Sequence, residues 1–290
     1  MDLSFLQSLL LVVDSGSLAQ AARTQQLTGA ALRQRVAAME RELGVKLLTR
    51  SGHTSLPTQA CTDLLPRARH MLREFALMKE DIDTTGISGH LRIGAISTAL
   101  TGLMPKTLRA LALHAPKVTP FLKPGSSLEL YNALLAEQLD AVITVAAPFA
   151  TPKSITEVPL RSEPLVLISP PKTNLSVKQQ LTTLHYIRYD ATSWGGRFAQ
   201  QYVLDQRLAP RLLCDLDALE AIALMVAQNL GVSLVPAWQD LNDLKSKVQV
   251  TPIQGSKYHR KIVLMMRQTS AQTDKMKLLT SLLVNHAPPR

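Results

Sequence analysis

The chain has few cysteines and few aromatic residues. Only two of its 290 residues are cysteine, Cys61 and Cys214, and Phe, Trp and Tyr together make up 4%. Two distant cysteines exclude a disulfide-stabilised secreted scaffold. With scattered histidines they also form no recognisable zinc-ligand spacing. Cys214 lies in an apolar segment, which favours a packed thiol.

Long apolar runs and common catalytic motifs are missing as well. No stretch of about 18 apolar residues exists, so we expect no membrane span and no membrane partner. The apolar residues 9–13 have neither a basic leader nor a small-residue cleavage site, so we expect a cytoplasmic protein without a signal peptide. No Walker phosphate loop, Gly-x-Ser-x-Gly turn or carboxylate pair stands out. We therefore expect no enzyme, no metal and no cofactor.

The composition that is present is that of a folded protein. Hydrophobic residues make up 46% and charged residues 19%, and the length corresponds to two domains of about 100–200 residues each. The net charge of +10 suggests an anionic partner, although solubility alone also explains it. Residues 1–90 are nearly neutral, so the excess lies in residues 91–290.

The first sixty residues have the pattern of a helix-turn-helix. Apolar positions three and four residues apart predict a first helix up to residue 13, and Ser17 begins a second one. Thr28 is the expected N-cap of a third helix that Gly44 ends. The apolar face of this third helix is formed by Leu32, Val36, Met39 and Leu43.

The opposite face of the third helix is polar, as DNA reading requires. Such a helix fits the major groove, where Arg33 can bind guanine and Gln34 can bind adenine. After Gly44 the residues predict a strand, a polar turn and a second strand, and this wing places Arg50 and His53 near phosphates. A three-helix protein-interaction module with solvated charges is the alternative.

A heptad pattern follows the wing. Its apolar positions are Leu64, Ala68, Met71, Phe75, Met78 and Ile82. Such a seam indicates pairing with a second helix, whereas packing on its own domain is the alternative. Pro66 predicts either a kink or a new helix that begins near Leu65. The polar residues 84–89 form the expected hinge.

The remaining residues alternate between strands and helices. The pattern of this region predicts a parallel sheet with crossover helices. Its expected strands are 91–96, 118–122 and 140–145, and its expected helices are 97–114 and 128–138. Pro120 fits only an edge strand. Further strands are expected at 165–168, 186–189, 212–214, 231–236 and 261–266, and further helices at 196–207, 216–228 and 274–284.

Ligands of open α/β sheets bind beyond the carboxyl ends of the strands, where helix N-termini favour anions. Ser97, Thr98 and Ser126 fall at such junctions, as does Arg197, whose guanidinium can hold a carboxylate. Trp194 can form an apolar wall. Each of these residues also has an alternative to ligand contact. The hydroxyls can cap helices, Arg197 can lie at the surface, and Trp194 can pack in the core.

Both halves of the sequence resemble LysR-type transcriptional regulators. In the first half the matching residues are Phe5, Gly16-Ser17, Ala21-Ala22, Leu27-Thr28, Met39-Glu40, Leu43-Gly44, Leu47-Leu48-Thr49-Arg50 and Thr58-Gln59-Ala60-Cys61. In the second half they are Gly89-x-Leu91-Arg92-Ile93-Gly94, Leu139-Asp140-Ala141-Val142-Ile143 and Gly231-Val232-Ser233-Leu234-Val235-Pro236. The resemblance covers essentially the whole chain.

The resemblance implies an α+β winged helix-turn-helix domain over residues 1–58 and a linker helix with a hinge over 59–88. An α/β two-lobed domain with the fold of periplasmic binding proteins would follow over 89–290. Its first lobe would hold residues 91–161 and 267–290, and its second lobe 162–266. The chain would cross between the lobes near Leu160 and Arg267.

The family's functional positions fall on two sets of residues. The DNA-binding candidates are Ser17, Thr28, Gly29, Ala30, Arg33, Gln34, Arg35, Arg50 and His53. The effector-binding candidates are Ser97, Thr98, Ser126, Thr144, Trp194 and Arg197. Gly29 stands where the family often has glutamine, which implies an unusual DNA sequence preference.

The implied function is a bacterial regulator that binds double-stranded promoter DNA as a dimer or tetramer. A small organic effector, expected to be anionic, would modulate that binding, and RNA polymerase is a further expected partner. A redox sensor of this family would need a reactive cysteine pair. The competing readings are a transport solute-binding protein, which would need an export signal and no helix-turn-helix, and a metabolic enzyme with a DNA-binding appendage.

Overall fold

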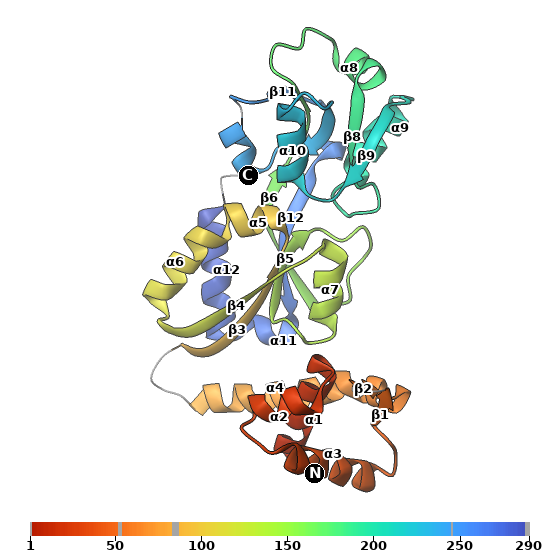
Figure 1. Cartoon of the computed structure of the whole chain (residues 1–290). Coiled ribbons are helices and arrows are strands. Elements are labelled where there is room, and N and C mark those ends of the chain that lie inside the picture. The colour runs from red at the N-terminus through yellow and green to blue at the C-terminus, as the bar shows by residue number, and fades with distance from the viewer. Residues whose placement is uncertain (1, 52–53, 83–86, 245, 288–290) are drawn as a thin grey trace. The chain divides into compact units, whose positions relative to one another are not determined.

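The computed structural model describes residues 2–51, 54–82, 87–244 and 246–287 (Figure 1). The chain divides into two compact units. One holds Met1–Gly86 with Ala136–Gln138, and the other holds Ile87–Leu135 with Leu139–Arg290. Each unit is described by itself below.

The N-terminal unit is a helix-turn-helix with a wing. It contains α1 (Leu3–Ser15), α2 (Leu18–Thr24), α3 (Gly29–Leu43), β1 (Leu48–Ser51), β2 (Thr54–Pro57) and α4 (Gln59–Ile82). The expected caps are present: Ser17 accepts a hydrogen bond from the Gln20 amide at 3.3 Å, and Thr28 accepts one from Ala31 at 3.1 Å. Gly44 ends α3 at φ 69°, a left-handed conformation that favours glycine.

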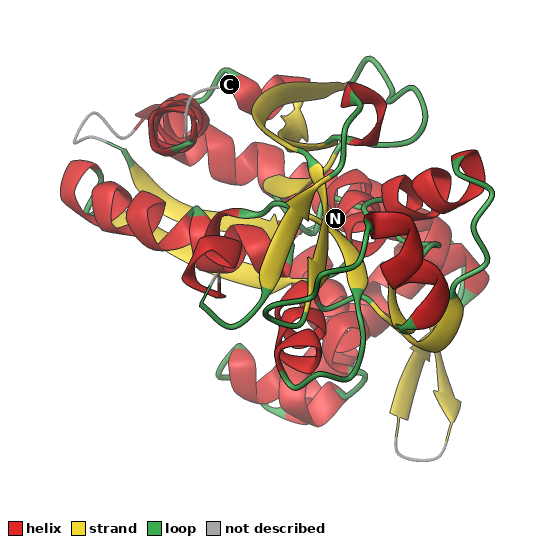
Figure 2. Ribbon diagram, turned by 90° about the horizontal axis from the view of Figure 1, so that it is seen from above, coloured by secondary structure: helices red, strands yellow, loops and turns green. Residues whose placement is uncertain are grey.

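The wing is an antiparallel hairpin in which Leu48 pairs with Pro57 and Ser51 with Thr54. Its strands stand out from the helices of the unit (Figure 2). Hydrogen bonds attach it to the helices: the Ser55 amide donates to the Gly16 carbonyl at 3.0 Å, and the amides of Leu47 and Leu48 donate to Glu40 of α3 at 2.9 and 3.3 Å. The wing therefore has a fixed base on the helix-turn-helix.

The linker helix α4 runs without interruption through Pro66, so the expectation of a new helix near Leu65 is wrong. One side of α4 packs on its own domain, with Cys61 and Ala68 fully buried. Met71 and Met78 are 45% and 60% exposed, although both belong to the predicted seam. Packing on its own domain is therefore observed for one side of α4, and pairing of the other side with a second helix stays a prediction.

The first lobe of the C-terminal unit is built on a five-stranded sheet with the order β4-β3-β5-β12-β6. Its elements are β3 (Ser88–Ala95), α5 (Ser97–Gly102), α6 (Met104–His114), β4 (Lys117–Pro124), α7 (Ser127–Leu135), β5 (Ala141–Val145), β6 (Ile155–Glu163), β12 (Arg260–Arg267), α11 (Gln268–Ala271) and α12 (Asp274–His286). Helices α6 and α12 lie on one side of the sheet and α7 on the other (Figure 1).

The predicted parallel sheet is confirmed for three strands, since β3 pairs in parallel with both β4 and β5. Strand β4, which carries Pro120, lies at the edge as expected. The predicted helix over residues 97–114 is instead two helices, α5 and α6, which meet at Leu103.

The second lobe has β7 at its centre, with β10 and β11 antiparallel on either side. Its elements are β7 (Leu165–Ser169), α8 (Val177–Thr183), β8 (His185–Tyr189), α9 (Arg197–Asp205), β9 (Arg211–Leu216), α10 (Leu219–Ala227), β10 (Ser233–Pro236), the 3-10 helix η1 (Gln239–Leu244), β11 (Gln249–Pro252) and η2 (Ser256–Tyr258). Strands β8 and β9 pair in parallel, and Tyr186 bridges to Val232 beside β10.

The sequence-based boundary of the second lobe needs a correction. Strand β12 was expected within it, but β12 pairs with β5 and β6 in the first-lobe sheet. The chain therefore returns to the first lobe at Arg260 rather than near Arg267. A strand that is apolar on both faces looks the same in either sheet, so its partners cannot be read from its own residues.

Candidate functional site

Helix α3 presents a polar surface over a buried apolar one. Leu32, Val36 and Met39 are at most 5% exposed, and they pack in the cores that also hold α1 and α2. Arg33 and Gln34 lie in the first two turns and are exposed. Both side chains are thus free of the domain core, as contact with base edges requires.

The other candidates at the start of α3 also lie at the surface. Thr28 and Ala30 are exposed, and Gly29 is half-buried. Nothing lies within 4 Å of the position that a Cβ of Gly29 would take, and its backbone is not left-handed. The fold would therefore accept a side chain here, so packing does not require glycine at this position. Ser17 is half-buried and caps α2.

Arg35 differs from the expectation. Its Nη1 donates to Ser8 Oγ at 3.3 Å, and its guanidinium carbon lies 5.8 Å from the centre of the Phe5 ring. Both partners belong to α1. The structure therefore gives this side chain a packing role between α3 and α1, because a residue three positions after Leu32 borders the apolar face of the helix.

Of the two wing candidates, Arg50 lies in β1, where its backbone pairs with Ser55. His53 lies outside the residues that the structure describes. The geometry therefore supports the wing itself and leaves the phosphate contacts of these side chains as a prediction.

The second site is a cavity of about 370 Å³ between the two lobes of the C-terminal unit. The first lobe contributes the turns that follow β3 and β4, together with Val145 at the end of β5. The second lobe contributes the loop after β8 and the segment after β9. These are carboxyl ends of strands, as the sequence predicts.

Four of the six effector candidates line this cavity: Ser97, Thr98, Ser126 and Trp194. Thr144 does not, since it is fully buried within β5 and its neighbour Val145 faces the cavity instead. Among the described residues the Thr144 hydroxyl has no hydrogen-bond partner.

Arg197 does not line the cavity either. Its guanidinium carbon lies 4.7 Å from the centre of the Phe198 ring, and burial lowers its pKa. Arg197 begins α9, but it is not among the residues that line the cavity, so the predicted carboxylate clamp is not found on the described cavity wall.

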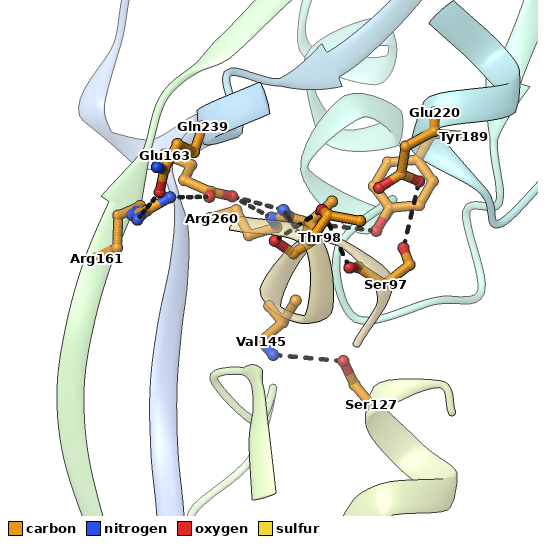
Figure 3. Close-up of polar contacts among 11 residues, drawn as sticks. Ser97, Thr98, Ser127, Val145, Arg161, Glu163, Tyr189, Glu220, Gln239 and Arg260 are labelled. Carbon is orange, nitrogen blue, oxygen red and sulfur yellow. Dashed lines mark hydrogen bonds and ion pairs between the residues drawn. The ribbon is translucent and has the colours of Figure 1, made fainter. Parts of the chain in front are cut away.

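The arginine that does line the cavity is Arg260, which is only 2% exposed (Figure 3). Its Nε donates to Glu163 at 2.7 Å, and its Nη2 donates to Thr98 Oγ1 at 3.1 Å. Its Nη1 donates to the Tyr189 hydroxyl at 3.3 Å. Arg260 thus connects β6, α5 and β8, which belong to both lobes. Its only sequence signal is a charged residue at the start of an apolar strand.

A second arginine extends this network. Nη2 of Arg161 donates to Gln239 of η1 at 2.7 Å, and Nη1 lies 3.8 Å from Glu163 (Figure 3). Burial lowers the pKa of Arg161, against the attraction of Glu163. Glu163 therefore holds two guanidinium groups at the point where the chain passes between the lobes.

An aromatic cluster makes a further link between the lobes. The ring of Trp194, in the second lobe, lies 5.6 Å from that of Tyr131 and 5.5 Å from that of Phe149, both in the first lobe. Trp194 is 6% exposed and belongs to the first-lobe core. It is thus both core and cavity wall, and the two interpretations from sequence are compatible.

The described residues contain no group of His, Cys, Asp or Glu arranged to hold a metal ion, and none of their helices is long and apolar enough to span a bilayer. Cys61 is fully buried, and Cys214 is half-buried in β9.

Burial raises the pKa of Cys61 to about 11, from an ordinary value of 9.0. This higher pKa lowers the thiolate fraction of Cys61 at neutral pH about 100-fold. We expect iodoacetamide to label Cys61 at least about 100-fold more slowly in the folded protein than in guanidinium, as followed by mass spectrometry, with Cys214 as the internal comparison. Equal rates in both states would show that Cys61 is accessible.

Fold and sites together define a two-domain protein that combines a DNA-reading helix with a ligand-binding cavity. The family model "LysR substrate binding domain" matches residues 84–288, and "Bacterial regulatory helix-turn-helix protein, lysR family" matches residues 3–62. The chain belongs to the LysR family of DNA-binding transcriptional regulators.

Similar proteins agree with this assignment. The nitrogen assimilation regulatory protein nac of Klebsiella aerogenes is 28% identical over 243 residues, which cover 81% of this chain and 78% of that protein. A full-length OxyR variant of Pseudomonas aeruginosa has the same fold, with a TM-score of 0.75, 21% identity and 98% of each chain covered. Full-length CbnR, solved in complex with its target DNA, has a TM-score of 0.64, 20% identity and 99% of each chain covered.

Proposed function

We propose that this regulator reads its DNA site through the N-terminal half of α3. The observation that carries the proposal is the exposure of Arg33 and Gln34 on a helix whose Leu32, Val36 and Met39 are buried, whereas Leu43, expected on the same apolar face, is exposed. Thr28, Gly29 and Ala30 lie at the same end of the helix and would contact the groove or its phosphates. Ser17, at the start of α2, and the wing residues Arg50 and His53 would add phosphate contacts, which position the helix without selecting the sequence.

We also propose that the interlobe cavity is the effector site, with Ser97, Thr98, Ser126, Trp194 and Arg260 on its wall. Both lobes line it, so a ligand that contacts both favours one relative placement of the lobes. Such a preference is what couples a ligand to DNA binding. The chain would act in the bacterial cytoplasm, and the DNA-bound form would contact RNA polymerase.

Pairing through α4 would give the oligomer, a dimer or a tetramer, that a two-part DNA site requires. The exposed side chains of Met71 and Met78 support this. Apolar side chains are unfavourable in water, and a second helix paired along the seam would bury them.

The change Met71→Asp with Met78→Asp is expected to convert the protein to monomers, because each paired helix would then bury two carboxylates in the seam. Light scattering coupled to size-exclusion chromatography measures the mass. Thr62→Asp is the matched control, since Thr62 lies on the opposite side of α4 and is exposed. An unchanged mass in the double variant would place the oligomer contact elsewhere.

Transcript sequencing of cells that lack this chain tests the function as a whole. A regulator of this kind changes a small set of transcripts, and the wild-type chain restores them whereas the Arg33→Ala chain does not. Unchanged transcripts in the deletion strain, under conditions where the chain is expressed, would contradict the proposal.

A further inference from the structure

The interlobe cavity is more negative than positive, although the surrounding half of the chain is basic. Three of its lining residues are charged: Asp190, Asp217 and Arg260. The charge of Arg260 is already matched, since its Nε and Nη2 lie 2.7 and 2.5 Å from Glu163. On the described wall, the carboxylates of Asp190 and Asp217 therefore face no cation whose charge is still unpaired.

These two carboxylates follow the carboxyl ends of the two strands of the β8–β9 sheet. Asp190 follows β8 and Asp217 follows β9, which are parallel neighbours, and the Asp190 amide donates to the Leu216 carbonyl at 3.1 Å. Asp190 is held in place because its Oδ1 accepts from both the amide and the hydroxyl of Thr192 at 2.8 Å.

The electrostatics of Asp217 reflect this crowding. Burial raises its pKa, and the carboxylates of Asp190 and Glu129 raise it further, whereas Arg260 and Ser193 act in the opposite direction. A positive charge placed beside Asp217 would offset both the lost hydration and the like-charge repulsion.

A third carboxylate lies next to this wall. Oε2 of Glu220, in α10, accepts from Ser97 Oγ at 3.4 Å (Figure 3). Its Oε1 is shielded from solvent and accepts no hydrogen bond from any described residue. Glu220 is not among the residues that line the cavity, so it adds negative charge beside the wall rather than a direct ligand contact.

We propose that the cavity binds a small organic cation, an amine or guanidinium compound of about the size of an amino acid. Its positive group would lie at Asp190 and Asp217, and its carbon skeleton would lie against Trp194, whose ring also attracts cations. The volume of about 370 Å³ is near the lower end of ligand pockets. This proposal rests on the cavity being the effector site, and it replaces the anionic effector expected from net charge.

The test compares cations with neutral or anionic molecules of the same length on the full-length protein. The probes are L-arginine against L-citrulline, L-lysine against L-norleucine, and putrescine against succinate, at constant ionic strength. We expect at least one cation to raise Tm by roughly 5–10 °C at 100 times its Kd, whereas its counterpart does not.

Variants locate the binding. Asp217→Asn is expected to weaken binding of that cation about tenfold or more by calorimetry. Asp243→Asn, an exposed position outside the cavity, is the matched control and should leave Kd unchanged. Affinity should also fall as the pH is lowered towards the raised pKa of Asp217, because the protonated carboxyl loses its attraction.

The outcomes separate this proposal from the effector function itself. Binding of succinate or the neutral probes in preference to the cations, or unchanged cation affinity in Asp217→Asn, would overturn the cation proposal and leave the effector site standing. If no compound of any charge in a broad metabolite set changes Tm, the effector role of the cavity fails as well.

Discussion

Replacing Arg260 by methionine is expected to lower the free energy of unfolding of the C-terminal unit by about 3–5 kcal/mol. Methionine keeps much of the length but removes three contacts, those to Glu163, Tyr189 and Thr98. The larger part of the loss comes from Glu163, which is 2% exposed and would keep a buried charge with only Arg161 near it. Urea unfolding followed by tryptophan fluorescence reports this unit, since the only two tryptophans, Trp194 and Trp238, both lie in it.

Two further variants test whether the lost contacts of Arg260 cause this loss of stability. Arg211→Met, at an exposed position on β9, should change stability by less than about 0.5 kcal/mol. The double variant Arg260→Met with Glu163→Met should be more stable than Arg260→Met alone, because the buried Glu163 carboxylate is removed together with its partner while Arg161 keeps its hydrogen bond to Gln239. A single Arg260→Met variant as stable as the wild type would show that Arg260 does not hold the lobes in the way described.

Replacing Arg33 by alanine is expected to relax the choice of base at one position of the DNA site by about 1–3 kcal/mol. The side chain is exposed in the second turn of α3, where a guanidinium can form two hydrogen bonds with guanine. Binding to each single-base variant of the site, measured by fluorescence anisotropy at fixed salt, gives the discrimination directly.

Arg35→Ala is the matched control for this measurement. Its guanidinium contacts Ser8 and Phe5 of α1, so its loss should reduce the stability of the domain and leave base preference unchanged. An equal loss of affinity on every DNA sequence in Arg33→Ala would mean that Arg33 contacts phosphate only. A changed base preference in Arg35→Ala would contradict the packing role of that residue.

Local signals predicted the N-terminal unit well. Helix caps at Ser17 and Thr28, the stop at Gly44 and the apolar periodicity of α3 each act within a few residues, so they are visible in sequence. The same periodicity places Arg33 and Arg35 on different faces of α3, because two positions correspond to about 200° around a helix. The edge position of β4 followed from one proline for the same local reason.

The sequence predicted several residues of the cavity wall but not its charged residues. Ser97, Thr98, Ser126 and Trp194, at or near strand-to-helix junctions, line the cavity, and their contacts with an effector stay a prediction. Which charged side chains face inward depends on pairs far apart in sequence: Arg260 meets Glu163 across 97 positions, and Asp190 meets Asp217 through the pairing of β8 and β9. Net charge averages over the whole surface, so it does not identify which charged residues line the cavity.

The most direct test of the central claim is selection of genomic DNA by the purified full-length protein, followed by sequencing of the bound fragments. A helix-turn-helix regulator is predicted to enrich a few fragments that share one partly palindromic motif, and Arg33→Ala is predicted to blur one base of each half-site. Diffuse binding that depends only on salt, with no shared motif and no difference between the two proteins, would contradict the account.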